Sequence, residues 1–435
     1  MNYDQAVEYI FSHLPMFTRI GGAAYKADLS RTLHLCQAAG NPHLSFKSIH
    51  VGGTNGKGSV SSFLASVFME HGFKTGLFTS PHLIDFRERI RMNGEMIPKE
   101  FVADYITYNQ PLFSRIEPSF FEMSFALAAE YFKQSRVDIA IIEVGMGGRL
   151  DSTNVITPEV SIITNIGNDH KQFLGDTLDK IAWEKAGIIK EGVPVVIGEH
   201  QPETDAVFIT KSQSQRAPLY FAEDLFHLQD TWDDGAFLKL HYQDLSDNKS
   251  VSIESPLRGI YQQKNILTTL AALKVLQGRD YKIDEGRIKA GFEKVILNTG
   301  LAGRWQVMKK RPLVVADIAH NEPGIRVLME QVRQHTFSHL HLVLGMVADK
   351  DSAQILPLLP SDATYYFCRP DIPRGKEAAL LAQESAEFGL QGETYPSVRL
   401  AVEAALNDAG PEDMVLITGS AFVVAEALNS ELFLV

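Results

Sequence analysis

The chain has 435 residues, of which 45% are hydrophobic and 22% charged, and this length and composition predict a soluble globular protein of two or three domains. Its 53 acidic and 41 basic residues give a formal net charge of −12, which disfavours nucleic acid as a partner because phosphate backbones are bound by clustered Lys and Arg. Only two cysteines occur, Cys36 and Cys368, so neither a disulfide framework nor a cysteine metal site is expected.

We expect a cytoplasmic protein that does not bind membranes. The sequence contains no run of about 18 apolar residues that could span a bilayer. Residues 1–15 lack the basic-then-apolar form of a signal peptide, and the low cysteine content fits a reducing compartment. We further expect a monomer.

The first 200 residues alternate short β-rich apolar runs with helical patterns. Strands are expected at residues 48–51, 75–78, 139–144, 160–164 and 194–197, with helices at 58–71, 122–132 and 178–188. Such alternation predicts an α/β fold, in which a parallel sheet is covered by helices on both faces. Ligands bind such sheets at the carboxyl ends of the strands, where the loops converge.

In the rest of the chain, the pattern of apolar and polar residues changes twice. Residues 200–255 are more polar, with strand-like pieces such as 236–242, and predict a small β-rich extension before helical periodicity returns at 262–276. The turn-rich segment 297–303 predicts a linker, after which strands are expected at 313–316, 341–344, 363–367 and 414–418, with helices between them. We therefore predict two domains, residues 1–297 and 298–435, the second a smaller Rossmann-like α/β domain.

A glycine-rich loop, HVGGTNGKGSV at residues 50–60, lies between an expected strand and an expected helix. It departs from the common phosphate-binding loop, because Val51 stands where that loop has its first glycine and Gly58 separates Lys57 from Ser59. The free N–H groups and positive dipole end of a helix N-terminus favour an anion, to which Lys57 and the Ser59 hydroxyl can add contacts. The alternative, a plain strand-to-helix turn, requires neither the lysine nor four glycines.

An apolar strand, residues 139–142, ends in Glu143 and is followed by the glycines of 145–148. A buried Glu is costly unless it is paired or bound to a metal, and Mg²⁺ prefers one or two carboxylates together with phosphate and water. Glu143 therefore suits a Mg·ATP site, although it could instead hold the glycine loop by hydrogen bonds. From the residues alone, His170 indicates polar surface, Ser80 a cap and Lys185 a favourable charge near a helix C-terminus.

The glycine loop and several other segments together resemble one family. TNGKGS after a strand resembles the ATP loop of the Mur ligase superfamily, and GTNGKGS is typical of folylpolyglutamate synthase and dihydrofolate synthase. Segments that resemble further motifs of this family are SPHL (80–83), ERI (88–90), SFFE (119–122), EVGMGGRLDSTN (143–154), NDH (168–170), EKAGI (184–188), QQKN (262–265), AGR (302–304), DIAHN (317–321), GMVADKD (345–351) and TGS (418–420). The resemblance covers essentially the whole chain, with mild departures at Ser119, Met146, Ser152 and Ala302.

The resemblance implies a Mur ligase central domain followed by a glutamate ligase domain, and it assigns residues to ligands. For ATP it implies Thr54, Asn55, Gly56, Lys57, Gly58, Ser59, Asn265, Arg304 and Asp317. For Mg²⁺ it implies Ser80, Glu143, His170 and Lys185, the last as a carbamate formed with CO₂. For the pterin or folate it implies Ser119, Phe120, Phe121, Glu122, Leu150, Asp151 and Ser152, with His320 on the glutamate side. Lys57, His170, Lys185 and Arg304 are the expected catalytic residues.

The implied reaction is ATP-dependent addition of L-glutamate to a folate through an acyl phosphate. The acceptor is dihydropteroate, a tetrahydrofolate, or both, and we favour both because pterin-site motifs accompany the polyglutamylation pattern. The alternatives are a monofunctional folylpolyglutamate synthase, another Mur-type amide ligase and, from a different class, a P-loop kinase or nucleotide switch. A peptidoglycan Mur ligase is disfavoured, because the loop near residue 50 leaves no room before it for a UDP-binding domain.

Overall fold

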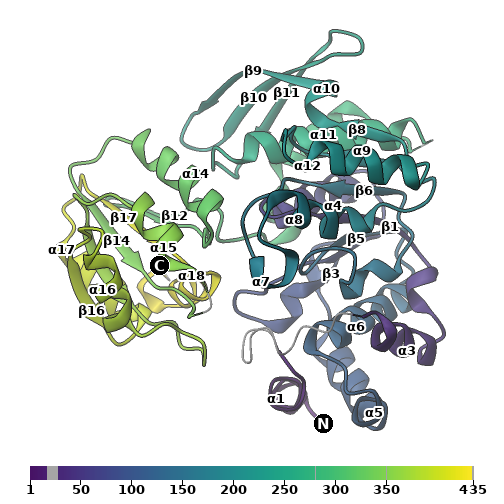
Figure 1. The fold of residues 1–435 in the computed structure, drawn as a ribbon, viewed down its shortest axis with the longest axis horizontal. Coiled ribbons are helices and arrows are strands. Elements are labelled where there is room, and N and C mark those ends of the chain that lie inside the picture. Colours follow the sequence, from purple (N-terminus) through teal and green to yellow (C-terminus); the bar gives the residue numbers. More distant parts are fainter. Residues whose placement is uncertain (17–27, 280, 349, 434–435) are drawn as a thin grey trace. The chain divides into compact units, whose positions relative to one another are not determined.

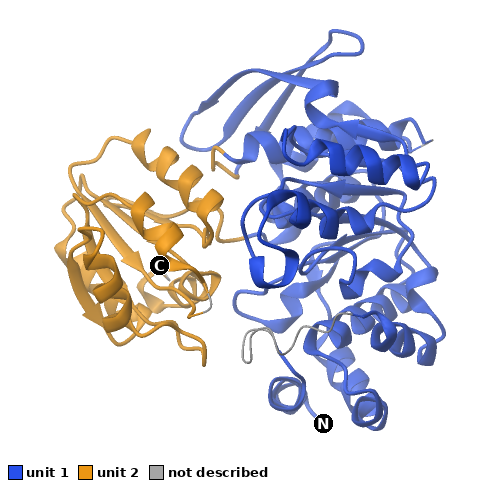
Figure 2. Ribbon diagram, viewed as in Figure 1, with its two compact units in different colours: residues 1–256, 261–301 blue, residues 257–260, 302–435 orange. Residues whose placement is uncertain are grey.

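The computed structural model describes residues 1–16, 28–279, 281–348 and 350–433, which form two compact units (Figures 1 and 2). Unit 1 comprises Met1–Pro256 and Tyr261–Leu301, and unit 2 comprises Leu257–Ile260 and Ala302–Val435. The chain therefore passes between the units after Pro256, after Ile260 and after Leu301. The sequence predicts a boundary between residues 297 and 298, and it gives no indication of the short excursion at 257–260.

Unit 1 is built on an eight-stranded sheet whose order is β4-β3-β2-β5-β1-β6-β7-β8. The strands are β1 (Lys47–Gly52), β2 (Thr75–Phe78), β3 (Ile90–Met92), β4 (Glu95–Met96), β5 (Ile139–Glu143), β6 (Val160–Ile163), β7 (Val195–Ile197) and β8 (Leu219–Phe221). β2, β5, β1, β6, β7 and β8 run parallel, so their carboxyl ends lie at one edge of the sheet. β3 and β4 continue it in antiparallel pairing.

Helices cover the sheet of unit 1. They are α1 (Tyr3–His13), α3 (Ser30–Ala38), η2 (Pro42–Leu44), α4 (Lys57–Glu70), η3 (Phe86–Arg89), α5 (Lys99–Ile116), α6 (Phe120–Ser135), η4 (Ser152–Val155), α7 (Lys171–Leu174), α8 (Leu178–Lys185), η5 (Ala186–Ile188), α9 (Asp205–Ser214), α10 (Ala222–Leu225), α11 (Gln262–Gln277), α12 (Glu285–Glu293) and α13 (Val295–Thr299). Alternate strand residues Phe78, Ala140 and Ile142 pack with α5 and α6, and Ile163 and Val195 pack with α8 and α9. α4 lies against β1, β2 and β5, and α11 lies against β6 and β7.

A separate three-stranded antiparallel sheet, in the order β11-β10-β9, forms the predicted β-rich extension, but only from residue 226 onward. The earlier part of the range predicted for it, 200–255, is wrong, because residues 205–225 form α9, α10 and β8 of the main sheet. Its strands are β9 (Phe226–Asp233), β10 (Leu238–Asp244) and β11 (Ser250–Ser255). Leu238, Leu240 and Tyr242 alternate with partly exposed residues, and the Tyr242 hydroxyl donates to the Gln263 carbonyl of α11 at 2.6 Å. One face of the small sheet is therefore buried against the rest of unit 1, where α11 and α12 lie.

Unit 2 contains a six-stranded sheet in the order β12-β13-β17-β14-β15-β16, in which only the β12–β13 pair is antiparallel. The strands are β12 (Gln306–Lys310), β13 (Leu313–Ala316), β14 (Leu340–Leu344), β15 (Thr364–Cys368), β16 (Gly392–Tyr395) and β17 (Met414–Thr418). The helices are α14 (Glu322–Arg333), α15 (Ser352–Ile355), η6 (Leu356–Leu358), α16 (Ala378–Ala386), α17 (Val398–Asp408), α18 (Ala421–Leu428) and η7 (Glu431–Phe433). Neighbouring strand residues face opposite sides: Val315 and Leu342 pack with α14–α16, whereas Val314 and Val343 pack with α17 and α18.

The predicted α/β class and the predicted parallel strands of both halves are confirmed. The linker predicted at 297–303 is partly wrong, because residues 297–299 belong to α13, which ends where Gly300 takes a left-handed φ of 67°. The strands β3, β4, β8, β12 and β16, which lie at or next to the sheet edges, were not predicted, since they are short or partly exposed and lack a buried apolar run.

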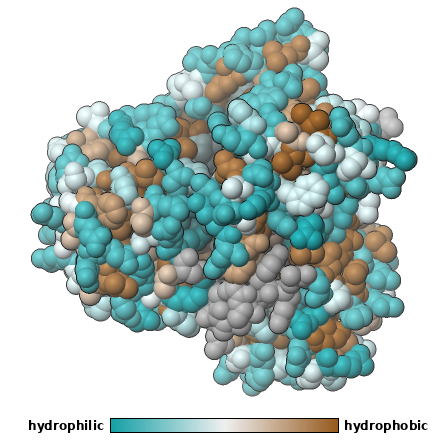
Figure 3. All heavy atoms as spheres, viewed as in Figure 1, coloured by the Kyte–Doolittle hydropathy of each residue, from teal (hydrophilic) through white to brown (hydrophobic). Residues whose placement is uncertain are grey.

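The drawn face in Figure 3 is mostly hydrophilic, with apolar side chains scattered over it. The largest exposures of apolar side chains among the described residues are single cases such as Tyr108 at 84% and Leu297 at 82%. None of the helices in the described ranges is both long and apolar enough to cross a bilayer.

Candidate active site

The glycine-rich loop joins the carboxyl end of β1 to the N-terminus of α4. β1 is buried except at its first residue, and the chain turns through Gly53 (φ 134°) and Gly56 (φ 84°) before the helix begins at Lys57. The first turn of a helix has backbone N–H groups without intrahelical partners, and here they follow directly on the loop. The loop therefore lies between a buried strand and a helix N-terminus, as the sequence predicts, and anion binding by it stays a prediction.

Gly56 lies directly against α11. A Cβ added at Gly56 would stand 2.1 Å from Asn265 Oδ1, and Asn265 Nδ2 donates to Gln262 Oε1 at 2.8 Å. Gln262 Nε2 in turn donates to Ser59 Oγ at 3.2 Å. Ser59 and Asn265 lie in distant segments of the sequence, and both are predicted to bind ATP. Gln262 thus joins them at the start of α4.

Replacing Gly56 by alanine tests this contact. The substitution adds a methyl group against Asn265 and strains a positive φ, so we expect the KM for ATP to rise about tenfold, equivalent to about 1.4 kcal/mol of nucleotide binding. Gly72→Ala is the matched control, because Gly72 follows the other end of α4 at φ +81° with nothing within 4 Å of the added Cβ. It should cost only stability, about 1–2 kcal/mol, measured by thermal unfolding. An unchanged KM in Gly56→Ala would contradict the assignment.

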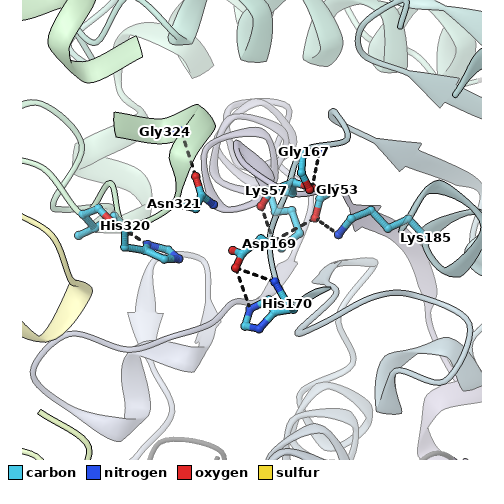
Figure 4. Close-up of polar contacts among 11 residues, drawn as sticks. Gly53, Lys57, Gly167, Asp169, His170, Lys185, His320, Asn321 and Gly324 are labelled. Atoms are coloured by element: carbon cyan, nitrogen blue, oxygen red, sulfur yellow. Dashed lines mark hydrogen bonds and ion pairs between the residues drawn. The ribbon is translucent and has the colours of Figure 1, made fainter. Parts of the chain in front are cut away.

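Two lysines meet at the Gly53 carbonyl oxygen (Figure 4). Lys57 Nζ donates to it at 3.2 Å and to the Thr54 carbonyl at 3.0 Å, and Lys185 Nζ donates to it at 2.7 Å. Lys185, at the end of α8, is 4% exposed. Burial, reinforced by the charge of Lys57, lowers its pKa to about 7, while Asp169 and Asp151 oppose the shift. Lys185 therefore holds its proton weakly for a lysine.

The segment after β6 carries Asp169 and His170 to the same region (Figure 4). His170 has a left-handed φ of 51° and precedes α7, and its backbone N–H donates to Asp169 Oδ1 at 2.8 Å. His170 Nε2 lies 3.8 Å from the same carboxylate oxygen. Asp169, which was not among the predicted site residues, is thus placed to orient His170.

Glu143 ends β5 and is 3% exposed. The Ser80 backbone N–H donates to Glu143 Oε2 at 2.9 Å, which brings two of the predicted metal ligands together at the carboxyl ends of β2 and β5. No three His, Cys, Asp or Glu side chains within the described ranges gather so as to hold a metal on their own. A buried carboxylate beside a serine nevertheless fits Mg²⁺, which takes its other ligands from phosphate and water.

Ser119 and Glu122, predicted to contact a pterin, form a capping box at the start of α6. Ser119 Oγ accepts from the Glu122 N–H at 3.2 Å, and a Glu122 carboxylate oxygen accepts from the Ser119 N–H at 2.6 Å. Both side chains therefore bond to the helix's own backbone. Phe121 packs over Gly145, where an added Cβ would stand 2.5 Å from its ring, and Phe120 lies under the Arg89 guanidinium, 4.9 Å from the ring centroid.

The segment of Leu150, Asp151 and Ser152 is fixed mainly by the buried Asp151. One of its carboxylate oxygens accepts from Thr153 N–H at 3.0 Å, and the other accepts from Met146 N–H at 2.9 Å. Burial raises the pKa of Asp151, against the hydrogen bonds that lower it. Leu150 is half-buried and Ser152 is buried at the start of η4, so the three residues border the glycine turn after Glu143. Pterin contact by residues of either segment stays a prediction.

In unit 2, Asp317 follows β13 and is 3% exposed. Its carboxylate accepts from the backbone N–H groups of Trp305 at 2.7 Å and Ala319 at 2.9 Å. These bonds hold the turn that carries Arg304, whose guanidinium donates to the Ala302 carbonyl at 3.2 Å. His320 Nδ1 lies 2.8 Å from the Ile318 carbonyl oxygen (Figure 4). The roles of Arg304, Asp317 and His320 toward nucleotide and glutamate stay predictions.

The chain matches two family models and many known proteins. The Mur ligase middle domain matches residues 51–273, and the glutamate ligase domain of Mur ligases matches residues 303–421. The folylpolyglutamate synthase of Lacticaseibacillus casei is 34% identical over 98% of this chain and 97% of its own length. The chain belongs to the folylpolyglutamate synthase and dihydrofolate synthase family of Mur ligases. The predicted family is thereby confirmed.

Other members of the folylpolyglutamate synthase and dihydrofolate synthase family extend the likeness. The dihydrofolate synthase/folylpolyglutamate synthase of Bacillus subtilis is 31% identical over 92% of this chain and 94% of its own length. A solved structure of E. coli FolC in complex with DHPP and ADP is 29% identical, covers 98% of this chain and 97% of its own, and has a TM-score of 0.85. The predicted fold and enzyme class, a carbon–nitrogen ligase, are confirmed.

Several residues that shape the site of this family member were not predicted from the sequence. Asn165, Glu199 and Gln201 follow β6 and β7 at the same edge of the sheet as the glycine loop. Their partners are far away in the chain: Asn165 Oδ1 accepts from the Asn55 N–H, and Glu199 binds Lys264. The segment TNIGNDH around Asn165 contains a family motif, but that motif is the Asp-His pair, and it does not single out Asn165.

Proposed function

We propose that this chain is an ATP-dependent ligase that adds L-glutamate to folates, acting both as dihydrofolate synthase and as folylpolyglutamate synthase. The single observation that supports it most is the meeting of the glycine loop, Lys57 and Lys185 at one carbonyl oxygen, in a chain similar over nearly its whole length to both kinds of synthase. ATP is the proposed co-substrate, because a structural relative holds ADP.

The proposed reaction forms the amide in two steps. A carboxylate oxygen of the folate attacks the γ-phosphorus of ATP, the bond to the ADP oxygen breaks, and an acyl phosphate results. The amino group of L-glutamate then attacks the acyl carbon, loses a proton and expels phosphate. The protein's contribution is chiefly positioning and charge neutralisation, to which Lys57 and the backbone N–H groups of α4 are suited.

Ser80, Glu143 and His170 are the residues that would hold Mg²⁺, which supplies charge neutralisation to the phosphates when bound. We propose that Lys185 takes up CO₂ as a carbamate, with its nitrogen bonding the carbon of CO₂ and releasing one proton. Its low pKa and burial support this, because only the neutral amine is a nucleophile. The carbamate would replace a cation that stands beside Lys57 by an anion.

An assay with separate acceptors tests the proposal. We expect sustained ADP release from ATP and Mg²⁺, over many turnovers, only when L-glutamate and either dihydropteroate or a tetrahydrofolate are both present. Activity on the tetrahydrofolate alone would favour the monofunctional alternative. Multiple-turnover phosphorylation of an acceptor without glutamate, beyond one acyl phosphate per enzyme, would overturn the ligase assignment. We also propose that the protein is a cytoplasmic monomer. The buried free thiols of Cys36 and Cys368 suit a reducing compartment. Light scattering would determine the oligomeric state.

A further inference from the structure

We propose that Glu199 and Gln201, which follow β7, are positioning residues for the glycine loop, and that they act on it through the segment 165–167. The inference rests on the proposed function, since it takes the loop to be the ATP site. Neither residue is among those that the sequence assigns to a ligand. Both lie at the carboxyl edge of the sheet, one strand further out than the segment they contact.

The segment 165–167 holds the first half of the loop by its backbone and one side chain. Thr54 N–H donates to the Asn165 carbonyl at 2.9 Å, and Asn55 N–H donates to Asn165 Oδ1 at 3.0 Å. The Thr54 hydroxyl accepts from the Gly167 N–H at 2.9 Å. The path of the loop before Gly56 is therefore set by where Asn165 and Gly167 lie.

Gln201 fixes this segment by pairing with the backbone of Ile166. Ile166 N–H donates to Gln201 Oε1 at 2.8 Å, and Gln201 Nε2 donates to the Ile166 carbonyl at 2.8 Å. A side-chain amide that bonds both the N–H and the carbonyl of one residue makes the same hydrogen bonds that a neighbouring strand would make. Since β6 has ended at Ile163, Gln201 extends the support of the sheet to a segment that has left it.

Glu199 fixes the direction of the Asn165 amide. Asn165 Nδ2 donates to Glu199 Oε1 at 3.2 Å, which leaves Asn165 Oδ1 for the Asn55 N–H. The other Glu199 oxygen accepts from Lys264 Nζ at 2.5 Å, and Lys264 lies on α11. An acceptor at Glu199 thus selects the orientation in which Asn165 can bond the loop.

α11 links the two sides of the loop. Lys264 holds the first half through Glu199 and Asn165, while the neighbouring Gln262 and Asn265 contact Ser59 and Gly56 in the second half. The loop is therefore held in both halves by groups that are fixed to the same helix. Such support keeps a phosphate-binding turn in its bound shape before the ligand arrives and removes the cost of ordering it.

His200, which lies between Glu199 and Gln201, anchors the backbone of residues 199–201. Its ring stacks on Phe221 at a centroid distance of 3.9 Å, and Nδ1 lies 2.8 Å from Asp205 Oδ2. The other Asp205 oxygen accepts from the Gln201 N–H at 3.0 Å, and Glu223 accepts from the His200 N–H at 3.0 Å. Glu199 and Gln201 therefore project from a backbone that is itself fixed.

Gln201→Glu is the decisive variant. It keeps the size and the acceptor for Ile166 N–H but turns a carboxylate oxygen toward the Ile166 carbonyl, so the segment and the loop should lose their support. We expect the KM for ATP to rise about tenfold, as for loss of one well-made hydrogen bond, with KM for glutamate and folate within about twofold of the wild type. Gln277→Glu is the matched control, because Gln277 also donates to a backbone carbonyl, that of Ile283, but at the other end of α11.

Two variants of Glu199 test its role in the same assay, one that removes the acceptor for Asn165 and one that keeps it. Glu199→Leu should raise the KM for ATP about as much as Gln201→Glu, whereas Glu199→Gln keeps an acceptor for Asn165 and should recover most of the affinity. Thermal unfolding of each variant shows how much protein is folded at the assay temperature. If folded Gln201→Glu keeps its KM for ATP, or if all three KM values change together, the proposal is overturned. An unchanged KM for ATP in Lys57→Ala would instead refute the nucleotide site itself.

Discussion

Replacing Lys57 by alanine should reduce ligase activity by at least about a hundredfold, the scale seen when a positioned charge is removed from a transition state. Lys57 Nζ contacts only carbonyl oxygens of its own loop in the described structure, those of Gly53 and Thr54, so the variant loses a cation rather than part of the core. The measurement is ADP release with folate and glutamate, together with calorimetric titration of ATP. Thermal unfolding should stay close to that of the wild type.

Lys133→Ala is a matched control for Lys57→Ala. Lys133 also donates to two successive backbone carbonyls, those of Ala39 and Gly40, but it lies near the end of α6, just before the amino end of β5 and hence at the opposite edge of the sheet. We expect it to keep full activity and ATP affinity. Retention of more than about a tenth of the activity by Lys57→Ala would contradict the assignment, because a phosphate-binding cation contributes more than that.

Replacing Lys185 by methionine should abolish most activity without unfolding the protein. The side chain is buried and its charged form is disfavoured by burial and by Lys57, so an apolar group of similar length should be tolerated by the fold. If Lys185 carries a carbamate, ¹³C-labelled bicarbonate should give a carbamate signal in the wild type and none in the variant. The wild-type signal should weaken as the pH falls from about 8 to 6, since the amine becomes protonated and no longer reacts with CO₂.

Lys190→Met is the control for Lys185→Met. Lys190 is a second lysine with a lowered pKa, about 8, and it also donates to a backbone carbonyl, that of Asn154 at 2.8 Å. Its variant should keep both the carbamate signal and most of the activity. A fully active Lys185→Met would refute a role in the reaction, and an active wild type without any carbamate signal would refute the carbamate alone.

The glycine loop could be predicted because its signals are local. An apolar run, a glycine-rich turn and apolar residues at helical spacing follow one another within 25 residues, from Phe46 to Glu70, and β1 and α4 form where these patterns predict them. Glu143 was predicted for a similar reason, since a carboxylate that ends an apolar strand needs a partner. In the structure, the Ser80 N–H is one partner of the Glu143 carboxylate.

Other features could not be predicted, or were interpreted differently, because they depend on neighbours in space. Ser119 and Glu122 have the Ser-x-x-Glu spacing of a capping box, and the same four residues also resemble the family motif, so the sequence supports both interpretations. Glu199 and Gln201 act on residues that are brought to them by the pairing of β6 with β7. No periodicity or spacing in one sequence reports such pairing between loops.

The excursion of residues 257–260 means that no single cut in the chain separates the two units. The buried Gln331 of α14 accepts from the Ile260 N–H at 2.8 Å and donates to the Arg258 carbonyl at 3.0 Å, so these four residues belong to the structure of unit 2. A fragment of residues 302–435 would contain all the strands of the six-stranded sheet but lack both partners of that amide. During synthesis, unit 2 must likewise receive a piece of chain made long before its own first strand, with α11–α13 of unit 1 in between.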